Sequence, residues 1–156
     1  MAGEVVTAAL MNTHIRDNLN MVTGIPAAFT TGLNAATTQP TLGTGSSVSG
    51  SWLQVGKLVH YRVSIISGSS GTVPGSGTYQ FGLPVTPAVT NLSPVGQIVI
   101  SDTTTVIGIG HVAWDSGTTA HAYVIGTTGG TSLVTHTLFN VANNRRYLVT
   151  GSYEAA

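Results

Sequence analysis

Few residues of this sequence are of a type and spacing that could do chemistry. The chain has no cysteine, and its histidines show neither the His-x-His nor the His-Glu-x-x-His spacing of common zinc sites. The histidines stand at positions 14, 60, 111, 121 and 136. The sequence therefore predicts no metal site within one chain, and no motif in it indicates a cofactor.

The acidic residues number five in the whole chain, at Glu4, Asp17, Asp102, Asp115 and Glu154. A glycosidase needs two carboxylates about 5 to 9 Å apart, and so few acids argue against such a pair. Asp102 and Asp115 each follow a run that reads as a strand, where aspartate commonly forms a turn. The serines lie in Gly/Ser loops without a nucleophile-elbow pattern. We therefore predict a non-enzymatic protein.

Arg145 and Arg146 form a local basic pair after two asparagines. We interpret the pair as a turn followed by the start of a strand. The alternative is that it pairs with an acid on a neighbouring subunit, such as Asp17 or Glu154. One pair is far short of the basic stripe of a nucleic-acid site, and the net charge of the chain is zero. We expect no nucleic-acid partner.

The aromatic residues are candidates for a sugar-binding platform. Most of them fall in the middle of expected strands, where core packing is the default. Trp114 is the best exposed candidate, because it lies at a strand end beside the turn that begins at Asp115. We predict Trp114 and Asp115 as a ligand contact, should the chain bind a glycan or a protein through its strand-end loops.

The composition favours self-association over a free, soluble existence. Only 6% of the residues are charged, against about 25% in an average soluble protein, and such a surface is poorly protected against association with copies of itself. No apolar run approaches the roughly 20 residues that span a bilayer. No secretory signal is apparent at the start. We expect synthesis in a cytoplasm and no membrane insertion.

The stretch 52–67 organises the rest of the chain. From Val59 onward, apolar and polar residues alternate strictly, which indicates a strand with one buried face. Further strand signals follow at intervals typical of a sandwich or barrel. The expected strands are 51–55, 57–67, 78–83, 95–101, 106–114, 119–126, 133–139 and 146–153. We predict a mainly β fold over 51–156, an antiparallel, jelly-roll-like β-sandwich of about eight strands in two sheets.

The residues before this domain have a different pattern. Residues 1–23 predict a short helix of about 15 residues with one apolar stripe, capped by Thr7 and ended by Gly24 and Pro26. The stripe is expected to pack on the β-domain, on sister helices or on another protein. Residues 24–50 have no charge and no clean periodicity, so we predict an extended connector. The predicted interface residues on the stripe are Met11, Ile15, Leu19 and Val22.

Several motifs together carry a resemblance to a known class of proteins. The opening Gly3-Glu-Val-Val-Thr-Ala-Ala-Leu-Met-Asn-Thr-His-Ile-Arg-Asp-Asn-Leu19 resembles the N-terminus common in tailed-bacteriophage structural proteins, often tail fibre or minor tail proteins. Three pieces of the β-domain are similar to a domain found in the same proteins. These pieces run from Trp52 to Val63, from Gly77 to Pro84 and from Gly151 to Glu154.

The resemblance implies a component of the virion that is commonly a homotrimer and contacts other virion proteins. A typical fibre is longer and has shaft repeats, which this chain lacks, so a small head-decoration (capsid decoration) protein also fits. In a trimer, one histidine near the axis, His111 or His136, would supply three ligands to a metal ion; the alternative is a hydrogen-bonded histidine on a strand face. Two functions stay open: a structural assembly protein, which we predict, and a module that recognises host glycan or protein.

Overall fold

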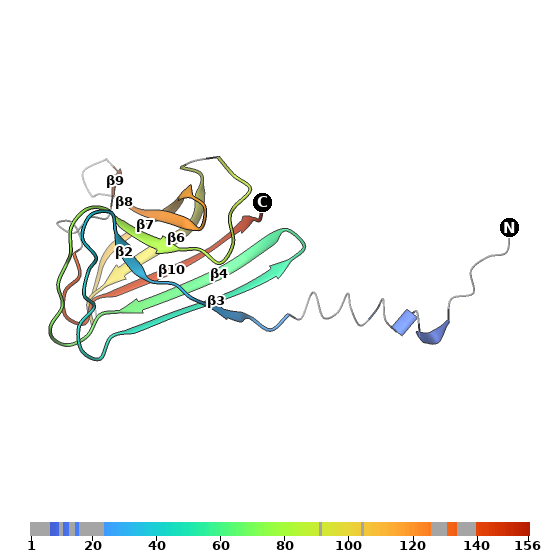
Figure 1. Cartoon of the computed structure of the whole chain (residues 1–156), viewed down its shortest axis with the longest axis horizontal. Coiled ribbons are helices and arrows are strands. Elements are labelled where there is room, and N and C mark those ends of the chain that lie inside the picture. Colours follow the sequence, from blue (N-terminus) through green and yellow to red (C-terminus); the bar gives the residue numbers. More distant parts are fainter. Residues whose placement is uncertain are drawn as a thin grey trace.

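The strands of the chain pair in one antiparallel sheet that curls around a common core (Figure 1). The computed structural model describes residues 7–9, 11, 12, 15, 24–90, 92–103, 105–125, 131–133 and 140–156. In this part of the chain the sheet has ten strands in the order β1-β3-β4-β10-β6-β7-β8-β5-β2, with β9 paired to β8. The strands are β1 Ala27–Phe29, β2 Leu33–Ala35, β3 Ser47–Val55, β4 Leu58–Ile66, β5 Tyr79–Gly82, β6 Pro94–Ser101, β7 Val106–Ser116, β8 Thr119–Ile125, β9 Thr131–Leu133 and β10 Arg146–Glu154. The prediction of a mainly β, antiparallel domain is confirmed.

Strand β4 shows the alternation that the sequence predicts. Val59, Val63 and Ile65 are fully buried and Tyr61 is 4% exposed, while His60 and Arg62 face solvent. β4 lies between β3 and β10 and pairs with both along its whole length. Its inner face therefore forms the middle of the core, and its outer face forms part of a broad polar surface.

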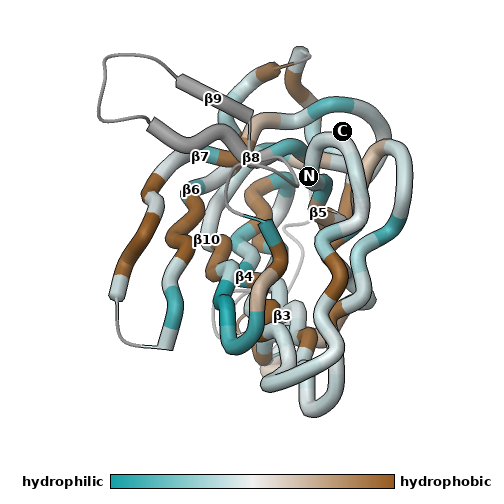
Figure 2. The backbone as a smooth tube through the Cα atoms, turned by 90° about the vertical axis from the view of Figure 1, so that its left-hand side faces the viewer, coloured by the Kyte–Doolittle hydropathy of each residue, from teal (hydrophilic) through white to brown (hydrophobic). Residues whose placement is uncertain are grey.

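One long hairpin gives the sheet its curl. Residues 33–55 run antiparallel to residues 58–82, through strand pairs at both ends and through bridges at Thr38–Ser76, Thr41–Val73 and Thr44–Ser70 between them. At one end of this hairpin β4 pairs with β10, and at the other end β5 pairs with β8. The sheet therefore folds over on itself (Figure 2). The strands follow one continuous order instead of the two separate sheets predicted for a jelly roll.

The segment predicted as an extended connector, residues 24–50, instead belongs to the sheet. It contributes β1, β2 and the first part of β3, and Leu33 and Ala35 of β2 are buried in the core at 5% and 3% exposure. Strands of three residues are too short to show a period-2 pattern. The correction moves the start of the β-domain to β1.

Two glycines let the Tyr61 ring pack against the backbone of neighbouring strands. A Cβ on Gly151 of β10 would lie 2.1 Å from the Val95 carbonyl oxygen and 2.8 Å from the Tyr61 ring. A Cβ on Gly96 of β6 would lie 2.5 Å from the Tyr61 hydroxyl. Such contacts are closer than real Cβ atoms show. The Tyr61 ring then meets Tyr153 edge to face, with ring centroids 5.6 Å apart.

The predicted N-terminal helix falls mostly outside the described residues, and Leu19 and Val22 of its stripe are among those outside. The amide of Met11 donates to the carbonyl of Thr7 at 3.0 Å, which is one hydrogen bond of the α-helical kind. The side chains of Met11 and Ile15 are 53% and 52% exposed. The helix itself stays a prediction. In the described part of the chain, no helix is long and apolar enough to span a membrane.

Candidate functional site

The predicted ligand residue Trp114 braces the turn between β7 and β8. Its indole N–H donates to the Gly117 carbonyl at 3.0 Å, and its backbone bonds with Leu92 and Ser93 at 2.9 Å each. The ring is half-buried and packs against the core cluster. Only part of this ring is therefore accessible to a sugar. The role of Trp114 as a ligand contact stays a prediction.

Asp115 of β7 forms a small polar cluster with the side chains of Gln80 on β5 and His121 on β8. Its carboxylate Oδ2 is 3.8 Å from His121 Nε2, which is also 2.9 Å from the amide nitrogen of Gln80. The side chains of Asp115 and His121 are 33% and 18% exposed. The strand register places His121 opposite both Gln80 and Ala113. The cluster joins the β7–β8 turn to β5, which gives Asp115 a structural use beside its predicted binding role.

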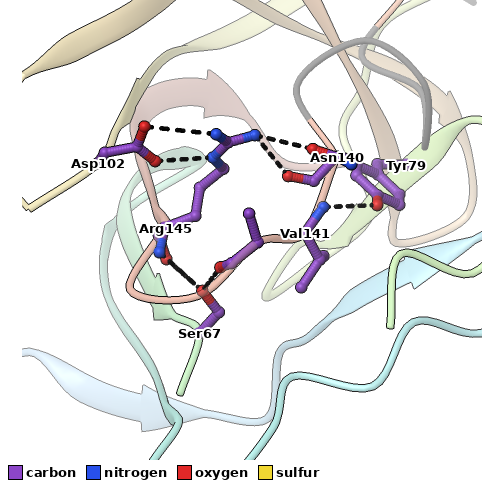
Figure 3. A network of polar contacts seen from close by, with 7 residues as sticks. Ser67, Tyr79, Asp102, Asn140, Val141 and Arg145 are labelled. Carbon is purple, nitrogen blue, oxygen red and sulfur yellow. Dashed lines mark hydrogen bonds and ion pairs between the residues drawn. The ribbon is translucent and has the colours of Figure 1, made fainter. Parts of the chain in front are cut away.

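Arg145 bonds to residues of its own chain (Figure 3). Its Nε donates to Asp102 Oδ1 at 2.9 Å, and its Nη1 donates to the carbonyl and side-chain oxygens of Asn140 at 2.8 and 3.0 Å. Arg145 lies just before β10, and Asp102 lies in the turn between β6 and β7. These contacts give Arg145 partners within the chain, and the alternative of an acid on a neighbouring subunit stays a prediction for the Arg145–Arg146 pair.

Ser67 and Tyr79 complete this network and fix the chain before Arg145 (Figure 3). The Ser67 hydroxyl donates to the carbonyl of Ala142 and accepts from the Arg145 amide at 2.8 Å. The Tyr79 hydroxyl donates to the Pro74 carbonyl at 2.7 Å and accepts from the Val141 amide at 2.9 Å. Burial raises the pKa of this phenol. Each of these partners is a backbone group, so the two hydroxyls tie separate segments of the fold together.

A row of polar side chains crosses the outer face of five adjacent strands, β3, β4, β10, β6 and β7. We call this row the polar track, and it comprises Ser51, Arg62, Thr150, Gln97 and His111. The register aligns them directly, because each residue is the pairing partner of the next. The side chains are exposed except that of His111, which is half-buried. Sequence alternation in β4 indicated the outward direction of Arg62, but the row depends on a strand order that alternation does not reveal.

Every residue of the polar track lines a hollow on this face. Ser51 and Arg62 lie between two hollows of about 260 and 330 Å³, one towards His60 and Leu53 and the other towards Ser49 and Ser64. Thr150, Gln97 and His111 line a third hollow of about 450 Å³, which also borders the glycines of β6 and β10. These volumes lie at or near the lower end of the range of small-molecule sites.

The charge on this face is simple. Arg62 is the one lysine or arginine that lines the three hollows, and no aspartate or glutamate lines them. Among the described residues, Arg62 has no ion pair, whereas Arg145 and Asp102 are paired with each other. An exposed guanidinium without a carboxylate partner is open to an anionic group of a ligand.

Among the described residues, no group of three or more histidine, aspartate or glutamate side chains lies close enough together to hold a metal ion. His111 lies on the polar track. His136 lies outside the described residues. An axial histidine in a trimer therefore stays a prediction.

No protein-family model matches the chain, and no curated protein matches it either. Among solved structures, the fold is similar to part of the Dettilon tailspike protein (gp208), with a TM-score of 0.54 and 14% sequence identity. The match covers 83% of this chain but 23% of the tailspike, so the chain spans less than a quarter of that protein's length. At this identity the likeness concerns the fold: this β-domain has the architecture of one portion of a tailspike.

Proposed function

We propose that the chain is a non-enzymatic structural subunit of a tailed-bacteriophage virion, made in the host cytoplasm and displayed at the particle surface. The observation that carries the proposal is the fold shared with part of a tailspike protein, which agrees with the N-terminal resemblance to phage structural proteins. The subunit associates with itself as a homotrimer and contacts other virion proteins. Its place is that of a small tail-fibre-like or minor-tail-like protein, or of a head-decoration protein.

The exposed apolar residues of the β-domain support self-association. Beside the polar track, the register aligns Leu148, Val99 and Ile109 on the outer face. Ile109 is 59% exposed, and Val106 further along β7 is 55% exposed. Buried apolar area is the main source of association energy between subunits. Few charges oppose such burial in a chain with 6% charged residues.

The N-terminal segment supports attachment to a partner. Met11 and Ile15 of its predicted apolar stripe expose about half of their surface, and a short amphipathic helix is marginal without a partner. Replacing Ile15 and Leu19 with Asp is expected to abolish incorporation into particles. Incorporation at the level of the unchanged protein would contradict an attachment role.

The native mass in solution tests the trimer. Light scattering at several protein concentrations measures this mass, and a monomer at every concentration would contradict the trimer.

A second candidate function is recognition of the host surface by the β-domain. The polar track favours it, because its hydrogen-bonding side chains and three hollows form a continuous face that structural packing alone does not require. Replacing residues of this face is expected to spare incorporation and lower binding of the purified protein to host cells. The alternative predicted from the sequence is recognition through the strand-end loops, with Trp114 and Asp115. Replacing these loops is likewise expected to spare incorporation into particles and to lower binding to host cells.

A further inference from the structure

We infer that the polar track is the binding site for an acidic glycan, whose chain lies across the strands of the outer face. The inference deepens the recognition function proposed above and rests on it. It places the contact on the face of the sheet, whereas the sequence suggested the strand-end loops. The ligand is defined by its chemistry: many hydroxyl groups along an extended chain, with negative charge on carboxylate or phosphate groups.

The dimensions of the track suit an extended chain. Ser51 lies on β3 and His111 on β7, with Arg62 on β4, Thr150 on β10 and Gln97 on β6 between them. Neighbouring strands lie about 4.8 Å apart, so the track extends over roughly 19 Å. That length accommodates several sugar rings in a row. The hollows on both sides of Ser51 and Arg62 give room for rings or substituents beside the main line.

The side chains of the track are suited to hydroxyl groups. Ser51 and Thr150 donate and accept through hydroxyls, Gln97 does both through its amide, and an imidazole such as that of His111 bonds through its ring nitrogens. Pro26 and Leu53 line the hollow beside Arg62 and offer apolar surface to the nonpolar faces of sugars. Ligand sites in proteins commonly combine apolar lining with a few placed polar groups.

The charge of the track selects an acidic ligand. Arg62 lies second in the row, flanked by Ser51 and Thr150, and no acidic side chain lines the three hollows. Hydrogen bonds between a guanidinium and a carboxylate or phosphate are about twice as strong as neutral ones. A nucleic acid would need several such cations along its backbone. A single cation among neutral polar groups instead fits a glycan of which one acidic group meets Arg62 while hydroxyl groups meet the rest of the row.

The binding test uses the full chain and three soluble probes of similar length. Isothermal titration calorimetry measures an oligogalacturonate, a glycerol-phosphate oligomer and the neutral maltohexaose. The first two separate a carboxylate from a phosphate as the source of charge. We expect at least one acidic probe to bind and the neutral probe to bind at least about tenfold more weakly.

Matched variants assign the binding to the track. Arg62→Gln is expected to weaken the acidic probe about tenfold or more, and Arg62→Lys less. Gln97→Ala is expected to weaken it as well, which a lone surface charge would not explain. Arg146→Gln is the control, because Arg146 is also an exposed cation on the sheet but lines none of the three hollows. Thermal unfolding of each variant shows that the domain is intact.

Three results would overturn the inference: no binding of either acidic probe, equal binding of the neutral probe, or equal losses in Arg62→Gln and Arg146→Gln. None of these would contradict a structural place in the virion, because incorporation into particles is measured separately. Conversely, glycan binding by a chain that is absent from particles would leave the site standing and contradict the proposed virion role.

Discussion

Arg145 and Asp102 form a bidentate ion pair that links the residues before β10 to the turn between β6 and β7. Nε of Arg145 is 2.9 Å from Oδ1 of Asp102, and Nη2 is 3.4 Å from Oδ2. The Arg145 side chain is 15% exposed and that of Asp102 is 45% exposed. The next residue, Arg146, is exposed and has no ion pair among the described residues. Two arginines that look alike in the sequence therefore differ in what they stabilise.

Replacing Arg145 with Ala is expected to lower the free energy of unfolding by about 1 to 2 kcal/mol, because charged hydrogen bonds to Asp102 and Asn140 are lost while solvent screens the exposed side of Asp102. Arg146→Ala is the matched control and should change it by less than about 0.5 kcal/mol. Urea denaturation measures both. Equal losses in the two variants would show that the ion pair adds no stability.

Tyr61 and Tyr79 make a second matched pair. The Tyr61 hydroxyl is buried without a hydrogen-bond partner in the described part of the chain, whereas the Tyr79 hydroxyl bonds to Pro74 and Val141. Tyr61→Phe is expected to preserve or raise the free energy of unfolding by up to about 1 kcal/mol, since an unsatisfied polar group is removed. Tyr79→Phe is expected to lower it by about 1 to 2 kcal/mol. A loss in Tyr61→Phe as large as in Tyr79→Phe would mean that the Tyr61 hydroxyl is bonded.

Alkaline pH is expected to destabilise the fold. Burial raises the pKa of the Tyr61 and Tyr147 phenols above their ordinary value of 10.0. Above about pH 10 the unfolded chain therefore binds fewer protons than the folded one, so the free energy of unfolding falls as pH rises. The contribution is fully present below about pH 10 and is lost as pH rises towards the folded-state pKa values. Urea titrations at rising pH, with tyrosinate absorbance, test this, and a flat free energy above about pH 10 would contradict it.

Glycine at position 151 is expected to be required by the close approach of β10 to β6. Gly151→Ala places a Cβ 2.1 Å from a backbone oxygen, which cannot rotate away, so we expect a loss of about 2 kcal/mol or more. Gly32→Ala is the control, because its Cβ would meet a side-chain atom only at 3.8 Å. The melting temperatures of the two variants compare them. If the Gly151→Ala variant had the same melting temperature as the unchanged protein, β10 and β6 would have to move apart at this point at little cost.

The local pattern of strands was predictable because it depends on alternation within one segment. The burial of Val59, Tyr61, Val63 and Ile65 follows from their spacing. Seven of the eight expected strands each overlap an observed one, and the eighth, 133–139, lies almost wholly outside the described residues. The strands β1 and β2 were missed because three residues carry no period. The long hairpin was missed because its middle is held by bridges every three residues among Thr, Ser and Gly, which sequence patterns assign to loops.

The candidate site was not predictable, because it is a property of strand order. Ser51, Arg62, Thr150, Gln97 and His111 are far apart in the sequence and become neighbours only through the register of five strands. The partner of Arg145 was missed for the same reason, since Asp102 lies 43 residues away in the chain. The position of Trp114 and Asp115 beside a turn, in contrast, was predictable, because the signal is local. Their role as ligand contacts stays a prediction.

The most direct measurement of the proposed function is mass spectrometry of bacteriophage particles purified from cultures that produce the chain, combined with immunogold labelling by an antibody against the β-domain. We expect the chain in intact particles at a copy number divisible by three, with label on the particle surface. Its absence from purified particles, with the protein found only in the lysate, would contradict a virion subunit.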